Sequence, residues 1–215
     1  MPVLTRTTPT KKRQERLIEK AHEREGWAVG FQDEVWWSRL TTPNLHSWVE
    51  DAPLKLVEQA HEKDDPDPKA LACYGIDLRY QKAEEVWIRF VEGNPRSDPT
   101  IDFMKWVLEK TAEQGIRVLL MFWDHASWHK SKKVRSWFYR HNQEVKRTGE
   151  GTRLLAVFLP KKSPWLNPIE PRWLHAKRKV VEPGRKLSAL ELSERVSAVF
   201  DQPVLPWITN SKSVS

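Results

Sequence analysis

Hydrophobic residues recur along the chain with two different spacings, which divide it into predicted helices and strands. Lys11 to Glu25 is charged, with apolar residues at helical spacing, so a short helix ended by Gly26 is expected. The compact apolar run from Trp27 to Gln32 predicts a buried strand. Residues 35–40 continue as a second strand or its turn. Residues 41–68 are rich in proline and acid, which predicts irregular structure.

The middle of the chain has the pattern of a β-hairpin followed by a helix. Residues 69–78 and 85–91 are predicted strands, and the alternation in the second gives it one apolar face. A turn near residues 79–83 joins them. The next helix is expected to have Asp98 as its N-cap, with a proline at the first helical position. Gly115 is expected to stop it.

The second half alternates between strands and helices. Residues 116–123 form a near-continuous apolar run, which favours a central strand buried on both faces. A helix from about Lys130, a strand over 154–159 and a helix containing Glu170 follow. Ser188 resembles the start of a capping box for a last helix that ends at Phe200.

The predicted order is a three-strand antiparallel meander, a helix, a buried strand, a helix, a strand and a helix. This order predicts an α/β fold with a mixed sheet flanked by helices. We expect an N-terminal tail and short helix over residues 1–26, one main domain over 27–200, and a C-terminal tail over 201–215.

Composition is that of a globular protein in a reducing compartment. The 215 residues are 39% hydrophobic and 30% charged. Cys73 is the single cysteine, which excludes an internal disulfide and suits the cytoplasm. The longest apolar run, 118–123, is too short to cross a membrane, and the N-terminus has no apolar stretch of the kind found in secretory signals.

Positive charge is concentrated in two segments, 130–147 and 161–186, within a formal net charge of +7. Such segments suit a polyanionic partner, because lysine and arginine neutralise phosphates. An alternative stays open, in which they only solvate helix faces. The candidate phosphate contacts are Lys130, Lys132, Lys161, Lys162, Arg172, Lys177, Arg178 and Lys179.

The segment from Ser163 to Glu170, Ser-Pro-Trp-Leu-Asn-Pro-Ile-Glu, carries a carboxylate to the start of a basic helix. Pro160 and Pro164 are expected to hold the approach extended. Asn167 is then the expected N-cap, which places Glu170 in the first turn. The simpler interpretation is a capping box in which Glu170 reaches back to the Asn167 N–H.

Three segments together carry a family resemblance. Ser163 to Glu170 resembles the last catalytic motif of the DDE transposases of the mariner-like superfamily, in their bacterial insertion-sequence branch. Phe31-Gln-Asp-Glu34, followed by two tryptophans, resembles the first motif. Trp123-Asp-His-Ala-Ser-Trp-His129 resembles the second. The motifs stand in the family's order.

The resemblance implies a ribonuclease H-like fold and metal-dependent DNA strand cleavage and strand transfer in transposition. Asp33, Asp124 and Glu170 would be the catalytic residues and would bind two Mg²⁺ or Mn²⁺ ions. In such a fold Asp33 and Asp124 end neighbouring parallel strands, which lie about 4.8 Å apart. DNA, as element ends and target, would be the partner of a homodimer in the bacterial cytoplasm, associated with the nucleoid when active.

The sequence also departs from the family. His125 stands where the family often has asparagine, and Lys161 and Lys162 replace a more aromatic or proline-rich approach. No helix-turn-helix module precedes residue 27, so we expect a catalytic half that works with a separate helix-turn-helix protein or a missing N-terminal half.

Other functions stay open on the sequence alone. One is a truncated, non-catalytic DNA-binding remnant of a transposase. Another is a zinc hydrolase built on Asp124, His125 and His129. If Asp33, Asp124 and Glu170 do form a cluster, their repulsion predicts that Asp124→Asn melts at or above the wild type without metal. Glu34 is expected to be structural, and His129 to position its loop or contact phosphate.

Overall fold

The computed structural model describes residues 11–40, 63–161, 163–180 and 186–209. The expected tail over 1–10, most of the irregular segment over 41–68, and Lys162 lie outside these ranges. In chain order the elements are α1 (Lys11–His22), β1 (Trp27–Ser38), β2 (Ala70–Tyr80), β3 (Ala83–Val91), α2 (Ser97–Glu113), β4 (Val118–Trp123), α3 (Lys132–Thr148), β5 (Arg153–Phe158), the 3₁₀ turn η1 (Pro164–Leu166), α4 (Ile169–Val180) and α5 (Ala189–Val199).

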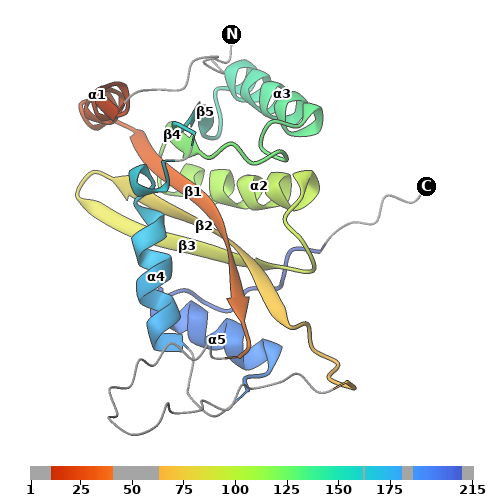
Figure 1. Ribbon diagram of the computed structural model, residues 1–215. Helices are drawn as coiled ribbons and strands as arrows, with labels where there is room; N and C mark the ends of the chain where they lie inside the picture. Colours follow the sequence, from red (N-terminus) through yellow and green to blue (C-terminus); the bar gives the residue numbers. More distant parts are fainter. Residues whose placement is uncertain (1–10, 41–62, 162, 181–185, 210–215) are drawn as a thin grey trace, which may run out of the picture.

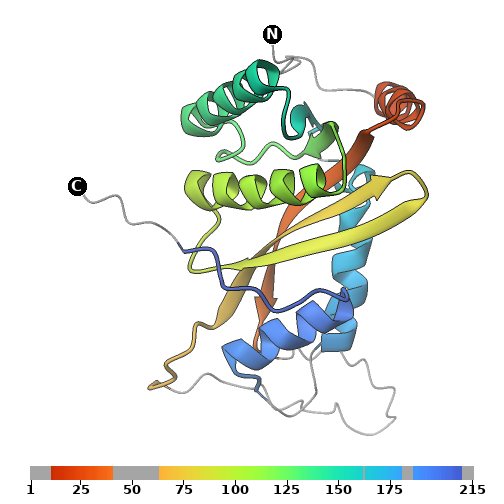
Figure 2. The same cartoon turned by 180° about the vertical axis from the view of Figure 1, so that it is seen from behind.

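The strands form one mixed five-stranded sheet in the order β3-β2-β1-β4-β5. β1, β2 and β3 are antiparallel, whereas β4 and β5 run parallel to β1. The predicted meander and mixed sheet are therefore confirmed. α2 lies behind the sheet in Figure 1 and in front of it in Figure 2, whereas α4 lies in front in Figure 1 and behind in Figure 2. The two helices therefore cover opposite faces of the sheet.

Helices cover both faces of the sheet, so both faces of β3 are apolar. Trp87 and Val91 belong to the core under α2 and α3, whereas Val86, Ile88 and Phe90 belong to the core under α4 and α5. A third cluster, which includes Phe31 and Phe122, packs against α1. The prediction that only one face of 85–91 is apolar is wrong. The alternation in the sequence did not reveal that a second layer of helices covers the other face.

β1 is one continuous strand rather than two. The prediction of a strand ending at Gln32 is wrong, because pairing with β2 runs unbroken from Val29 to Ser38. Val35 and Trp37 are buried under α4 and α5, so the apolar alternation resumes beyond the polar pair. The two acidic residues in the middle of β1 therefore led to the wrong prediction that the strand ends before them.

The parallel pairing of β1 with β4 ends early, and this creates the site. The last paired residues are Phe31 and Phe122. Asp33 and Asp124 each follow two residues later, so the same register brings them to the same level. Beyond this point β1 continues along β2 alone. Asp33 is thus in mid-strand, while Asp124 directly follows the end of β4.

Several predicted helix starts differ in detail. Arg96, not Asp98, is the N-cap of α2, and Asp98 lies in the first turn, paired with Lys133. The approach to α4 contains η1, so it is not extended throughout. Ser188 does cap α5, since its Oγ accepts a hydrogen bond from the Glu191 N–H.

The described part of the C-terminal segment packs against the sheet. Ile208 is buried and forms a parallel bridge with Val91, in which its N–H donates to the Phe90 carbonyl oxygen and its C=O accepts from the Glu92 N–H. Among the described residues, no helix has the length and hydrophobicity needed to cross a bilayer.

Candidate active site

Asp33, Asp124 and Glu170 line one pocket of about 420 Å³, although they come from β1, the end of β4 and α4. The fold therefore brings together the three acids that the sequence singled out. The pocket is completed by residues of the two loops that follow β4 and β5: His125, Leu159, Pro160, Lys161, Ser163 and Asn167.

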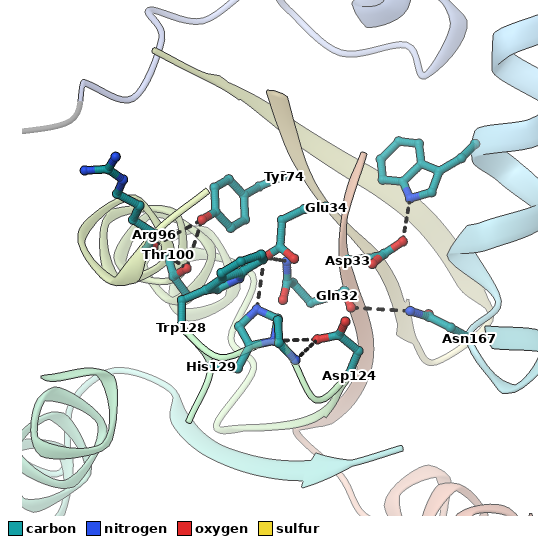
Figure 3. A network of polar contacts seen from close by, with 12 residues as sticks. Gln32, Asp33, Glu34, Tyr74, Arg96, Thr100, Asp124, Trp128, His129 and Asn167 are labelled. Atoms are coloured by element: carbon teal, nitrogen blue, oxygen red, sulfur yellow. Dashed lines mark hydrogen bonds and ion pairs between the residues drawn. The ribbon is translucent and has the colours of Figure 1, made fainter. Parts of the chain in front are cut away.

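Asp33 has the least favourable setting for a charge. Burial, and after it the neighbouring carboxylates of Glu170, Glu34 and Asp124, raises the pKa of its carboxyl group to about 8. Its Oδ2 accepts a hydrogen bond of 3.1 Å from the indole Nε1–H of Trp173 (Figure 3). An acid so placed ionises readily only when a cation compensates it.

Asp124 is held as the ionised form. Burial opposes its charge, but the hydrogen bonds from His129 and from the Ala126 N–H outweigh burial and lower its pKa. Because both donors approach the same oxygen, Oδ1, they hold the carboxylate in one orientation. The two aspartates therefore differ, although both border the same pocket.

His129 lies between two carboxylates. Its Nδ1 is 2.8 Å from Asp124 Oδ1, and its Nε2 is 2.9 Å from Glu34 Oε1 (Figure 3). The ring stacks on Trp123 with centroids 4.7 Å apart. Burial lowers the pKa of His129, but Glu34 and Asp124 outweigh it and raise the pKa to about 9.

Glu34 is part of the same network and does not line the pocket that Asp33 and Asp124 share, although it borders an adjoining pocket with Asp33 and Glu170. It accepts hydrogen bonds from Gln32 Nε2 and Trp128 Nε1 as well as contacting His129. This agrees with the expected structural role. His129 is only 1% exposed, so it orders its loop and is not placed to contact phosphate.

Glu170 lies in the first turn of α4 and is half-buried. Burial raises its pKa and Asp124 adds to the rise, whereas the charge of Lys177 opposes it. The simpler capping-box interpretation is not supported, because among the described residues no hydrogen bond joins the Asn167 N–H to the Glu170 side chain. The Asn167 side chain turns towards β1. Its Nδ2 is 3.4 Å from the Gln32 carbonyl oxygen (Figure 3).

The donor atoms of this pocket fit a hard divalent cation. Three carboxylates offer only oxygen, which Mg²⁺ and Mn²⁺ prefer over nitrogen or sulfur. The raised pKa of Asp33, caused first by burial and then by neighbouring carboxylates, shows that its negative charge is poorly compensated, and a cation would offset it. We therefore regard Asp33, Asp124 and Glu170 as the residues that would hold metal.

The zinc alternative fits less well. Ligand atoms of Glu34, Asp124 and His129 lie within 4.8 Å of one another, but they are already hydrogen-bonded among themselves. His125 is not part of that group: its Nε2 is 2.8 Å from the Leu159 carbonyl oxygen, and its ring stacks on Phe158. The residues chosen for the zinc hydrolase do not converge.

The predicted basic residues occupy different settings. Lys161 borders the main pocket, and Lys177 borders an adjoining one that Asp33 and Glu170 also line. Arg172 is engaged elsewhere, with Nε 2.9 Å from Asp77 and a terminal nitrogen 2.8 Å from Glu84. The remaining described candidates are solvent-exposed: Lys130, Lys132, Arg178 and Lys179.

Sequence reasoning missed the environment of these acids. Trp173 was expected only as one residue on a helix face, yet it donates to an acid 140 positions away. Asp77, fully buried between Arg79 and Arg172, was not identified. The spacing of three residues between Glu170 and Trp173 was visible, but the contact itself depends on how α4 crosses the sheet.

Comparison with known proteins identifies the family. The model of the DDE superfamily endonuclease matches residues 75–191, more than half of the chain, and the protein belongs to that family. The match includes Asp124 and Glu170, and Asp33 precedes it. No curated protein matches the chain significantly.

Solved structures of Mos1 transposase share the ribonuclease H-like fold predicted here. The Mos1 strand transfer complex matches with a TM-score of 0.55 at 14% identity, over 93% of this chain and 58% of that chain. The Mos1 mariner paired-end complex with Mn matches with a TM-score of 0.57 at 13% identity, over 93% and 59%. The chain thus spans under three fifths of the length of these proteins.

Proposed function

We propose that this protein is the catalytic domain of a DNA transposase that cleaves DNA at the ends of an insertion sequence and joins them to target DNA. Asp33, Asp124 and Glu170 are its catalytic residues and bind two Mg²⁺ or Mn²⁺ ions. The observation that carries the proposal is the convergence of these acids, from β1, β4 and α4, on one pocket. Family membership and the fold shared with Mos1 support it.

The chain's own residues act by position and charge. When bound, a metal pair activates the attacking oxygen and stabilises the leaving oxygen of a phosphodiester. Asp124 is pre-ordered by His129 and the Ala126 N–H, and Asp33 is oriented by Trp173. Lys161 and Lys177, at the pocket borders, attract the DNA backbone.

The wider assembly is part of the same proposal. Strand transfer joins DNA ends to a target, and the similar Mos1 structures are a strand transfer complex and a paired-end complex with the left transposon end. We propose a homodimer on DNA in the bacterial cytoplasm, with a helix-turn-helix module supplying recognition of the element ends.

A nicking assay on supercoiled plasmid tests the catalytic role. The wild type should nick with Mn²⁺ or Mg²⁺ and not with EDTA. Asp33→Asn, Asp124→Asn and Glu170→Gln, which remove charge with little change in shape, should each abolish nicking. Asp102→Asn is the matched control, since this partly exposed acid on α2 lies outside the pocket and, among the described residues, forms an ion pair with Lys105.

The outcomes separate the candidate functions. Nicking that survives any one of the three substitutions would show that this acid is not catalytic. DNA binding without nicking under either metal would identify the non-catalytic remnant instead.

A further inference from the structure

Trp173 links the helix that carries Glu170 to the strand that carries Asp33. Its side chain is 3% exposed, and its indole Nε1–H donates to Asp33 Oδ2 (Figure 3). Glu170 lies three residues earlier on α4, one turn away. One rigid turn of helix therefore holds one acid of the pocket and orients another.

A glycine makes this contact possible. Gly75 on β2 is the cross-strand partner of Asp33. A Cβ atom at position 75 would lie 2.3 Å from Trp173 Cη2 and 2.5 Å from its Cζ2. No real side chain tolerates such distances, so only glycine lets the indole approach β2 this closely and reach Asp33.

Two further rings pack against the indole in T-shaped arrangements. Trp37 on β1 meets it at 87° with centroids 6.1 Å apart, and Phe200 meets it at 85° with centroids 5.4 Å apart. The indole is thus confined by β2 and by two aromatic rings. This confinement fixes the orientation of its N–H, which donates to Asp33.

We propose that Trp173, seated on Gly75, is a positioning residue that orients Asp33 for metal binding and sets its distance from Glu170. This inference rests on the proposed function, in which Asp33 is a metal ligand. Outer hydrogen bonds of this kind hold ligating carboxylates in place, and their loss costs about 10- to 100-fold in metal affinity.

Mn²⁺ binding to the purified full chain, without DNA, provides the test. Free Mn²⁺ is measured by electron paramagnetic resonance during a titration. Trp173→Phe keeps an aromatic ring and removes only the donor and the outer ring, so the dissociation constant should rise about 10-fold or more. Trp87→Phe is the matched control, because its indole is buried in the core under α2 and α3 and donates to the carboxylate of Glu85. It lines neither pocket, so this variant should keep wild-type affinity.

Gly75→Ala tests the same contact while retaining the tryptophan. Its Cβ should displace the indole and weaken Mn²⁺ binding to a similar extent. In the Trp173→Phe background the clashing Cη2 and Cζ2 atoms are absent, so adding Ala at position 75 should weaken binding little further. Such non-additivity marks one shared interaction.

The outcomes distinguish this inference from the proposed function. Wild-type affinity in both Trp173→Phe and Gly75→Ala, or an equal loss in Trp87→Phe, would overturn the positioning role. Asp33→Asn should lose Mn²⁺ binding at this site. If Asp33→Asn loses Mn²⁺ binding while Trp173→Phe and Gly75→Ala bind it as the wild type does, only the positioning role of Trp173 fails. If Asp33→Asn binds Mn²⁺ as the wild type does, the proposed metal site fails with it.

Discussion

The Nδ1 atom of His129 lies 2.8 Å from Oδ1 of Asp124, and the opposite edge of the same ring contacts Glu34. The imidazole thereby joins the loop after β4 to the middle of β1, across 95 positions of sequence. Adjacent acids in the sequence therefore differ in role. Asp33 lines the pocket, whereas Glu34 supports Asp124 through His129.

A pair of substitutions at His129 separates its two contacts. Asn places a donor near the position of Nδ1, towards Asp124, whereas Gln places one near Nε2, towards Glu34. We expect His129→Asn to retain more metal-dependent nicking than His129→Gln, because only the former can still orient Asp124. Both should lower the melting temperature, since both lose the stacking on Trp123. Equal nicking by the two would contradict a role exerted through Asp124.

The apo protein should be stabilised by Asp33→Asn, increasingly so as pH rises. The folded pKa of Asp33 is about 8 and the unfolded value about 3.9, so the folded state holds this proton more tightly. The wild type therefore loses stability between about pH 4 and 8 as the unfolded state releases the proton first. Melts in EDTA across this range should show a gap that widens with pH and levels off above pH 8. A constant gap would argue against the raised pKa.

Asp124→Asn should have the opposite effect. The folded pKa of Asp124 is lowered, so its charge contributes stability that is present above the unfolded value and lost on acidification. The variant should melt below the wild type in EDTA at neutral pH, contrary to the sequence-based expectation of relieved repulsion. The physical reason is that His129 already compensates the charge of Asp124 in the folded protein without metal. Melting at or above the wild type would restore the simpler repulsion model.

The exposed basic end of α4 should carry part of the DNA affinity. Replacing Lys177, Arg178 and Lys179 with alanine should reduce the slope of log K against log salt by up to about 3, because each lost phosphate contact releases about one counterion fewer. Fluorescence anisotropy with a duplex at several salt concentrations measures this slope. An unchanged slope would place the DNA on another surface.

Arg172 should matter for stability rather than for DNA. Arg172→Ala leaves the fully buried carboxylate of Asp77 with Arg79 as its remaining ion-pair partner, so the free energy of unfolding should fall by about 1–3 kcal/mol. Arg178→Ala, on the exposed face of the same helix, should change it by no more than about 0.5 kcal/mol. Urea unfolding of both variants measures these two changes in the free energy of unfolding. A larger effect from Arg178→Ala would contradict the anchoring role of Arg172.

The sequence by itself determined the order of elements, the mixed sheet and the three acids of the pocket. Hydrophobic periodicity is a local property, so 116–123 and the helix stripe over residues 101–111 could be recognised without tertiary information. The motif around Glu170 was recognisable for a similar reason, since its residues are contiguous.

Only the tertiary structure decided the environment of each acid. Periodicity could not show that β1 continues past Asp33, because that depends on the register with β2 and on the helices that bury Val35 and Trp37. The opposite pKa shifts of Asp33 and Asp124 arise from burial and from partners distant in sequence, chiefly Glu170 and His129. Electrostatic interactions depend on distance in space, and the chain's linear order does not encode that distance.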